Sequence, residues 1–413
     1  EGGVQEVSSP HHLPPTSTST TRSTTTTRMY QTSNEGFTNL YKLRGGAGYY
    51  FCDLVDAVSA VSPEVRVRFT SPHPKDYPPE LLSLMAERPN VCNQLHMPAQ
   101  SGSSSVLSRM RRGYTRDAYL TLIDDVRSTI PDVALSSDFI AGFCDETIQE
   151  HQDTLSLMEQ VQYDQAYMFA YSMRGKTHAH RKMTDNVPEE IKKQRLQEVI
   201  QTFRTHVQRR NEHMELGRLR LVLVEGESRK STPTHRTLGG RTDQNKRILF
   251  PFPQDTTTLQ HPTTTTTTTP LWTDDMVRPL LSQLQSGTSH QDVLTNYYLQ
   301  QQSSTTTTTT PSPALSPPSP PPSSSSSSST LLQPGDYAVV EVTEVRGHTL
   351  RGRALWKTSL SSFADMGLFN VDDTALRHAS NLRQVLHHIL PPPPETRSSS
   401  SPPPQTNSTQ DSL

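Results

Sequence analysis

VALSSDFIAGFCDET (residues 133–147) gives the clearest evidence of the fold class, because it contains an apolar run that ends in a small polar loop and then enters an amphipathic helix. The same pattern occurs twice earlier in the chain, in VRVRFTSPHP (65–74) and in NQLHMPAQSGSS (93–104). Strands that alternate with helices in this way predict parallel βαβ units, whose functional groups gather where strands end in loops. We therefore expect these three loops to open at one edge of a sheet.

The composition limits the globular part to roughly the middle half of the chain. Of the 413 residues, 31% are hydrophobic and 33 are proline, which is too little apolar material for a core along the whole length. We therefore predict disorder over residues 1–36, over the Thr-, Ser- and Pro-rich insertion 254–333, and over most of the tail 358–413. The formal net charge of −2 hides a locally cationic segment over residues 217–251.

The three cysteines, Cys52, Cys92 and Cys144, lie far apart in the sequence. Their spacing excludes a contiguous CxxC-type zinc or iron–sulfur motif and argues against a disulfide scaffold, so buried thiols are expected. Nothing in the chain matches the run of about 18 apolar residues that would predict a membrane span.

The segment 37–187 is predicted to be an α/β region with four strands. A connector helix follows over residues 188–216, where Val199, Phe203 and Val207 form part of an apolar stripe beside a charged face. Helices are also expected before and between the strands, ending with one over residues 146–161. The four predicted strands are residues 65–69, 94–97, 133–140 and 165–171.

Short strands of even spacing predict a small β-barrel after the connector. Its two parts, residues 217–253 and 334–357, lie on either side of the insertion. They can still form one barrel, because the entropy of closing a loop grows only logarithmically with its length. The predicted barrel strands are LRLVLVEG (219–226), KRILFPF (246–252), DYAVVEVTEV (336–345) and HTLRGRAL (348–355).

Two of the strand-end loops carry groups that could bind a ligand. QSGSSS (100–105) enters a helix whose first N–H groups point outward, and Gly102 permits a tight turn, so this loop could hold a carboxylate or phosphate, or could simply cap the helix. Gly142 would let a ligand approach the backbone, while Asp138 and Glu146 could accept from ribose hydroxyls or an amino group. The alternative is that Asp138 is a buried hydrogen-bonded residue and Glu146 faces the helix dipole.

Two further loops supply candidate polar groups. Ser71 and His73 end a strand in a loop that prolines hold rigid; His73 could be a base or ligand, although a hydrogen-bonding role is favoured because no Cys, Glu or His lies at metal spacing. Arg174 and Lys176 follow the fourth strand and could hold a carboxylate or an RNA phosphate, or form a solvated loop.

An ordered set of motifs carries a family resemblance. RFTSPHP, LHMPAQSGSSSVLSRMRRGYT, SSDFIAGFCDET and FAYSMRGKT are followed by LVLVEGESRKS, GRTDQNKRILFP and LRGRAL. In this order they resemble the MiaB-type radical S-adenosylmethionine (SAM) tRNA methylthiotransferases, above all the vertebrate mitochondrial branch. The resemblance covers residues 29–251 and 333–356, and only the C-terminal portion of such an enzyme.

The resemblance implies a partial (βα) radical SAM barrel followed by a small all-β RNA-binding TRAM barrel. It implies SAM and [4Fe-4S] clusters as cofactors, and an isopentenylated adenosine beside the tRNA anticodon as the substrate that receives a methylthio group. Residues implied to line the SAM and nucleoside pocket are Ser71, His73, Gln100, Ser101, Gly102, Asp138, Gly142, Glu146 and Arg174. Residues implied to contact RNA phosphate are Arg218, Arg220, Arg229, Lys230, Arg241, Lys246 and Arg247.

The sequence also departs from the family, because it contains neither the CxxxCxxC loop nor the auxiliary-cluster domain. We therefore expect no metal ligands in this chain and no catalysis by it alone. The resemblance implies a mitochondrial location and a true N-terminus upstream of Glu1. It also makes a kinase regulatory subunit a candidate partner. A non-catalytic tRNA-binding protein and a kinase-regulatory scaffold remain the alternatives.

Overall fold

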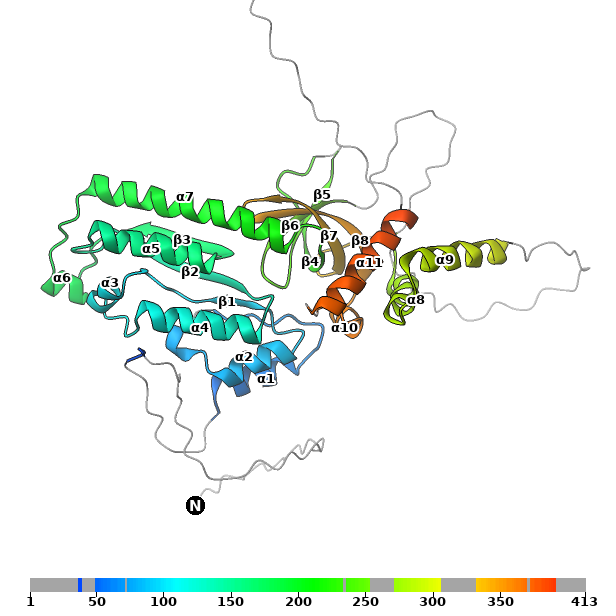
Figure 1. Cartoon of the computed structure of the whole chain (residues 1–413), viewed down its shortest axis with the longest axis horizontal. Helices are drawn as coiled ribbons and strands as arrows, with labels where there is room; N and C mark the ends of the chain where they lie inside the picture. Colours follow the sequence, from blue (N-terminus) through cyan, green and yellow to red (C-terminus); the bar gives the residue numbers. More distant parts are fainter. Residues whose placement is uncertain are drawn as a thin grey trace, which may run out of the picture.

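The computed structural model describes residues 36–38, 49–70, 73–232, 235–252, 271–305, 332–369 and 372–390, with side chains omitted over 301–305. Three parts lie along the long axis of the molecule: an α/β part with a three-stranded sheet, a closed β-barrel and a group of helices beside that barrel (Figure 1). No described helix has the length and apolar character needed to cross a membrane.

The α/β part is built on three parallel strands in the order β1 (Gln94–His96), β2 (Ala134–Ala141) and β3 (Gln165–Ala170). The register places Leu95 beside Leu135 and Ile140 beside Phe169. The accompanying helices are α1 (Phe51–Ser59), α2 (Pro79–Glu87), α3 (Ser104–Arg109), α4 (Arg116–Thr129), α5 (Ile148–Val161) and α6 (His178–Lys182), with a 3-10 turn at Pro74–Asp76.

The sheet is covered by helices on one face and is open on the other. On the covered face, Leu135 and Phe139 of β2 share a core with Leu157 of α5. On the open face, Tyr167 is 46% exposed and Phe169 is 55% exposed. Large aromatic side chains at alternate strand positions are usually buried, so this face has the character of an interior surface left uncovered.

The first predicted strand, over residues 65–69, was wrong as a regular strand. Only Val67 pairs with the sheet, in a single parallel bridge to Val91. The flanking arginines turn away, because Arg66 donates to the carbonyl oxygens of Arg241 and Leu221, each at 2.8 Å, and Arg68 reaches the barrel beside it. The arginines whose alternation with valines predicted a strand therefore fasten this segment to the barrel instead.

The predicted connector is present as α7 (Glu189–Met214). Its apolar stripe, which includes Val199, Phe203 and Val207, packs into the core of the α/β part. At its far end Asn211 donates to the carbonyl oxygen of Gly347 in the barrel at 2.8 Å. The long helix in Figure 1 thus spans both parts and holds them together.

The barrel closes in the order β4-β5-β6-β8-β7. Its strands are β4 (Leu219–Glu227), β5 (Thr237–Arg241), β6 (Arg247–Pro251), β7 (Tyr337–Arg346) and β8 (Thr349–Thr358). Four of them lie where the alternating pattern predicted strands. β5 was not predicted, because its sequence TLGGR holds two glycines and little apolar material.

The disorder predicted over 254–333 and 358–413 was wrong for much of the described part of both segments. They contribute α8 (Asp274–Gln285), α9 (His290–Thr305), α10 (Leu360–Asp365) and α11 (Asp373–Ile389). These helices pack with Trp356 of the barrel in a second core. The low overall hydropathy of the two segments concealed helical patterns such as Val277, Leu280, Leu281 and Leu284. Residues 1–35, 253–270, 306–331 and 391–413 lie outside the described part.

Replacing Gly240 by alanine is expected to destabilise the barrel. A Cβ there would collide with the carbonyl oxygen of Leu223 and the side chain of Val222 on the neighbouring strand, whereas a Cβ at Gly175 would meet nothing within 4 Å. We expect G240A to lower the free energy of unfolding by about 1–3 kcal/mol, as overpacking commonly does, and G175A to leave it unchanged. Urea denaturation of both variants measures this, and equal midpoints would contradict the described strand contact.

Candidate functional site

The loops after β1, β2 and β3 open at one edge of the sheet, because parallel strands end together. Two of them, the loops after β1 and β2, are among the three that the sequence predicted to share an edge, while the third predicted loop, after residue 69, is only partly described. The chain after β1 continues along β2, because the Gln100 N–H donates to the Asp138 carbonyl oxygen and the Ile140 N–H donates to the Gln100 carbonyl oxygen, each at 2.9 Å. On the other side, the Tyr171 N–H donates to the Ala141 carbonyl oxygen at 2.8 Å. We call this edge, formed by residues 98–104, 142–147 and 171–177, the rim. Ser71 lies outside the described residues.

His73 is held near the rim through Tyr114. Their rings lie 5.4 Å apart in an edge-on arrangement, and the Tyr114 hydroxyl donates to the Pro98 carbonyl oxygen at 2.8 Å. Burial, with Arg112 and Lys75 nearby, lowers the pKa of His73, so the neutral ring is favoured. Its Nδ1 accepts from the Lys75 N–H at 3.3 Å, which fits the hydrogen-bonding role favoured from the sequence.

The small residues of the first rim loop serve helix packing. Ser101 is buried, and its hydroxyl lies 3.2 Å from that of Thr154 in α5. The Gly102 N–H donates to the Thr154 hydroxyl at 3.0 Å, and a Cβ on Gly102 would lie 2.6 Å from the Thr154 Cα. Here the glycine permits the close approach of α5. The Gly102 N–H, which precedes α3, is therefore satisfied within the protein and is not available to an anion.

The second rim loop is closed by a buried carboxylate. Glu146 is 5% exposed and accepts from the Gly142 N–H at 2.8 Å and from Arg195 of α7 at 2.9 Å. Burial raises its pKa, while the Gly142 N–H and Arg195 oppose that shift. Gly142 has a φ of +76°, and a Cβ on it would lie 3.1 Å from the Cβ of Lys192. Glu146 and Gly142 thus face α7, and the space expected to admit a ligand is filled by Lys192.

A bidentate ion pair fixes α3 to α5 beneath the rim. Arg109 donates to both oxygens of Glu150, at 2.8 and 2.9 Å, and the Ser105 hydroxyl also donates to this carboxylate. The Thr147 N–H donates to it as well, which completes a capping box at the start of α5. The start of α5 is thus capped and reinforced by charge, whereas α3, for which the sequence predicted a cap, has Ser103 at its N-cap position without a side-chain hydrogen bond to the helix.

The open face of the sheet holds Asp138, which was a predicted site residue, beside His96 and Tyr167, which were not. Asp138 of β2 has a side chain 31% exposed, and its Oδ2 lies 3.4 Å from His96 Nε2 of β1. The His96 ring lies 5.9 Å from the Tyr167 ring of β3. Polar residues at alternate positions of β1 were the available signal for His96. A carboxylate, an imidazole and a phenol thus share one uncovered surface below the rim.

Arg174 and Lys176, expected at the rim, lie exposed in the loop between β3 and α6. Arg174 contributes its carbonyl oxygen to the Thr177 hydroxyl at 2.8 Å. Within the described ranges, no three His, Cys, Asp or Glu side chains form a group that could hold a metal ion. Cys92 and Cys144 are buried, and burial raises the pKa of Cys92 to about 12.

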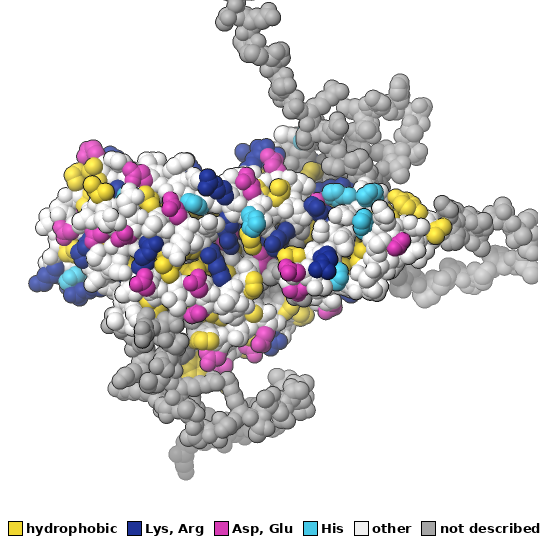
Figure 2. All heavy atoms as spheres, viewed as in Figure 1, with side chains coloured by type: hydrophobic (Ala, Val, Ile, Leu, Met, Phe, Trp, Pro, Cys, Tyr) yellow, Lys and Arg dark blue, Asp and Glu magenta, His cyan; other side chains and the backbone are white. Residues whose placement is uncertain are grey.

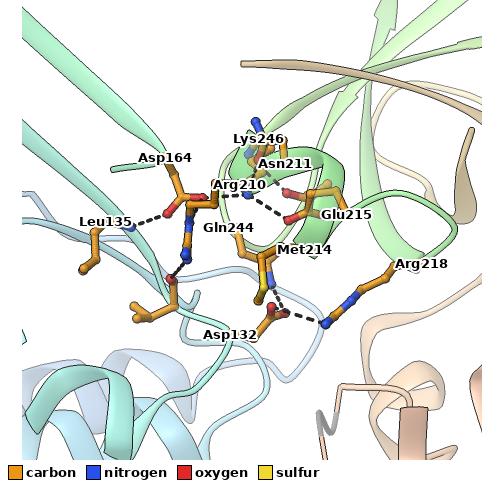
Figure 3. A network of polar contacts seen from close by, with 12 residues as sticks. Asp132, Leu135, Asp164, Arg210, Asn211, Met214, Glu215, Arg218, Gln244 and Lys246 are labelled. Atoms are coloured by element: carbon orange, nitrogen blue, oxygen red, sulfur yellow. Dashed lines mark hydrogen bonds and ion pairs between the residues drawn. The ribbon is translucent and has the colours of Figure 1, made fainter. Parts of the chain in front are cut away.

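Two of the residues predicted to bind RNA are internal. Arg220 is 8% exposed and pairs with Glu215 at 2.7 Å and with Asp132. Lys246, also 8% exposed, lies 2.8 Å from Glu215 and 2.7 Å from Asp164 (Figure 3). The prediction failed here because counting charges along the sequence does not reveal buried partners.

The other predicted RNA-binding residues lie closer to solvent. Arg229, Lys230 and Arg247 are exposed, while Arg241 is partly exposed and 3.5 Å from Glu225. Arg218 has a side chain 23% exposed, with a weak ion pair of 3.6 Å to Asp132. On the face shown in Figure 2, Lys, Arg and His side chains gather where α7 meets the barrel.

Comparison with known proteins relates about half of the chain to one enzyme family. Residues 27–158 match the radical SAM superfamily. The chain is 53% identical over 218 residues to the mouse protein named mitochondrial tRNA methylthiotransferase CDK5RAP1, and 55% identical over 217 residues to a rice CDK5RAP1-like protein. It is 47% identical over 203 residues to the Chlorobaculum tepidum tRNA-2-methylthio-N(6)-dimethylallyladenosine synthase.

The match to the mouse protein covers 53% of this chain and 36% of that protein. The match to the rice protein covers 52% and 36%, and the match to the Chlorobaculum protein covers 49% and 45%, in the same order. The chain thus spans less than half the length of these curated relatives. The resemblance drawn from the ordered motifs is confirmed: about half of the chain is similar to proteins named as tRNA methylthiotransferases, and residues 27–158 match the radical SAM superfamily.

Removing the Glu150 charge is expected to weaken the fold in a pH-dependent way. The Arg109 hydrogen bonds, helped by Ser105 and Thr147, lower the pKa of Glu150 to about 2. This stabilisation is present above the ordinary Glu pKa and is lost as the pH falls toward 2. After allowance for solvent screening we expect E150Q to cost roughly 1–2 kcal/mol at pH 7 and progressively less below about pH 4.5.

The matched control is E159Q on the same helix, because Glu159 is exposed. Thermal melts of both variants between pH 7 and pH 3.5 provide the measurement. A loss for E150Q that stays constant as the pH falls would rule out the ion pair as its cause.

Proposed function

We propose that this chain is a C-terminal portion of a tRNA methylthiotransferase, in which the rim and the open sheet face serve SAM and the target nucleoside, and the β-barrel binds tRNA. One observation carries the proposal: three parallel strands ending at a shared edge are joined by α7 to a closed five-stranded barrel, in the order of the family motifs. The names of the relatives favour this function over a kinase-regulatory scaffold.

The proposed substrate is an isopentenylated adenosine next to the tRNA anticodon, and the proposed location is the mitochondrion. The Chlorobaculum relative is named for 2-methylthio-N6-dimethylallyladenosine synthesis, and the mouse relative is named as mitochondrial. Asp138 is the best-placed residue for a ribose hydroxyl or an amino group, since its carboxylate is partly exposed beside His96. Gln100 would border the same part of the open face through its backbone pairing with Asp138.

The residues of this chain do not fit an iron–sulfur cluster. Cluster ligation requires several thiolates close together, and the full sequence has three cysteines and no CxxxCxxC. The raised pKa of Cys92 and Cys52 keeps both as thiols. A longer form of the protein would have to supply these ligands, so the chain itself is assigned only binding and positioning.

The proposed TRAM-like barrel would contact tRNA through its exposed cations, chiefly Arg229, Lys230 and Arg247. Long-range attraction to phosphate needs charges that face solvent, and these three do. Arg220 and Lys246 are left out of this surface because carboxylates neutralise both within the protein. Arg241 can contribute from the edge of the surface.

Binding of a tRNA anticodon stem-loop is expected to weaken steeply with salt. Each phosphate contact contributes about −0.9 to the slope of log affinity against log salt concentration. We therefore expect K230Q to reduce the slope by about 1, and R229Q/K230Q/R247Q to reduce it by about 3. Filter binding between 50 and 200 mM salt measures the slope.

The control is K193Q, which removes an exposed lysine near the opposite end of α7. Its slope should match that of the unaltered chain. An affinity that does not change with salt, or equal effects of K193Q and K230Q, would contradict the proposed surface.

Disruption of the corresponding gene is expected to remove the methylthio group from isopentenylated adenosine in mitochondrial tRNA, as measured by mass spectrometry of nucleosides. Rescue should require a transcript whose upstream reading frame encodes CxxxCxxC, because the present chain lacks the cluster ligands. Unchanged modification after disruption would refute the assigned substrate. Full rescue by the present chain alone would refute its assignment as a portion of the enzyme.

A further inference from the structure

A cavity of about 290 Å³ lies where the β-barrel, the sheet and the C-terminal helices meet. Asn93 precedes β1 and Asp132 precedes β2, so the cavity is at the edge of the sheet opposite the rim. It is therefore separate from the proposed SAM site. Helices α10 and α11 complete its wall, which the family resemblance does not cover. Its lining includes Asn93, Arg218, Asp243, Gln244, Phe369 and Arg383.

Two guanidinium groups converge on this cavity with incomplete charge compensation. Arg383 Nη1 lies 2.7 Å from the position of a Cβ on Gly217, next to Arg218 in the chain. Arg218 has only the 3.6 Å ion pair with Asp132. Arg383 lies 3.4 Å from Oε1 of Glu341, and Oε2 of the same carboxylate lies 2.7 Å from the ring of His387.

Arg218 Nη1 and Arg383 Nε have no hydrogen-bond partner within the described structure. Buried N–H donors of this kind are costly unless an acceptor reaches them. Together with the weak ion pairs, they indicate a place for an anionic group that can accept from both side chains, as a phosphate does.

The same wall also presents acceptors that lack donors. Asn93 Oδ1, Asp243 Oδ1 and Gln244 Oε1 are buried and without partners among the described residues. The other ends of two of these groups are fixed: Asp243 Oδ2 accepts from the Asn93 N–H at 2.9 Å, and Gln244 Nε2 donates to Asp132 at 2.7 Å. A ligand that satisfies this wall must therefore also donate hydrogen bonds, as the amino group of a nucleobase does.

The opposite wall is apolar and partly aromatic. Phe363 and Phe369 pack edge to face with ring centroids 4.8 Å apart, and Leu368 and Leu376 lie beside them. Leu216, at the mouth, is 52% exposed. Such a wall suits the face of a planar ring. The cavity volume is close to the lower end for ligand sites, so it suits a ligand no larger than one nucleotide.

We propose that this cavity binds a single nucleotide whose base carries an amino group, with the phosphate on Arg218 and Arg383 and the base between the aromatic wall and the three acceptors. The nucleotide can come from an unstacked position of bound RNA or from solution. The RNA source rests on the proposed tRNA binding, whereas the pocket itself does not.

The test is isothermal titration of the full chain with AMP, IMP, adenosine and inorganic phosphate. We expect AMP to bind about tenfold or more tightly than each of the other three, because IMP lacks the amino group, adenosine lacks the phosphate and phosphate lacks the base. Equal affinity for AMP and phosphate, or no AMP binding at millimolar concentration, would overturn the proposal.

Substitutions locate the site. R383Q should weaken AMP binding about tenfold or more, whereas R377Q on the same helix, outside the cavity lining, should leave it within about twofold. S380W should also abolish binding, because Ser380 lines the cavity and tryptophan would fill it without a change of charge. Thermal melts verify that each variant is folded. AMP affinity unchanged in both R383Q and S380W would place any nucleotide elsewhere and refute the proposal.

Competition identifies the source of the nucleotide. If saturating tRNA blocks AMP binding to the unaltered chain, the pocket holds a nucleotide of the RNA. If tRNA and AMP bind independently, the pocket holds a free nucleotide. Either result supports the pocket. Failure of tRNA to bind at all would count against the proposed function and leave the AMP result standing. Failure of AMP with intact salt-dependent tRNA binding would count against the pocket alone.

Discussion

The architecture depends on a buried network of charges between the sheet, α7 and the barrel (Figure 3). Glu215 at the end of α7 contacts Arg220 of β4 and Lys246 beside β6, and Lys246 also contacts Asp164, which precedes β3. Burial alone would raise the pKa of Glu215, but Arg220 and Lys246 hold it below its usual range. Removing one member would leave a buried charge uncompensated, at a cost of about 3–5 kcal/mol.

This network gives the two parts one relative orientation. Asp164 also accepts from the Leu135 N–H at 2.9 Å and from Arg210 of α7 at 3.1 Å, so the sheet edge is tied to the connector as well as to the barrel. Such pairs act only over short distances and in fixed geometry. The barrel surface is consequently held in a constant position relative to the rim, as the proposed binding of one tRNA by both parts would require.

The C-terminal helices extend this arrangement with a second core against the outside of the barrel. Trp356 of β8 is fully buried there, beside Leu382 and Leu386 of α11. Without these helices a large apolar surface of the barrel would face water. They also close the cavity in which Arg218 and Arg383 meet, so one packing interaction both protects the barrel and creates the proposed nucleotide site.

Local sequence patterns were sufficient to predict the parallel strands β1 to β3, the connector and four barrel strands, because hydrophobic periodicity reports burial of one face and small polar loops report strand ends. They could not show which polar residues have their partners inside the protein: Gly142 and Glu146 face α7, and Lys246 and Arg220 lie inside the buried network. The partners of these residues come from distant segments of the chain, and only the packing of the folded molecule brings them together.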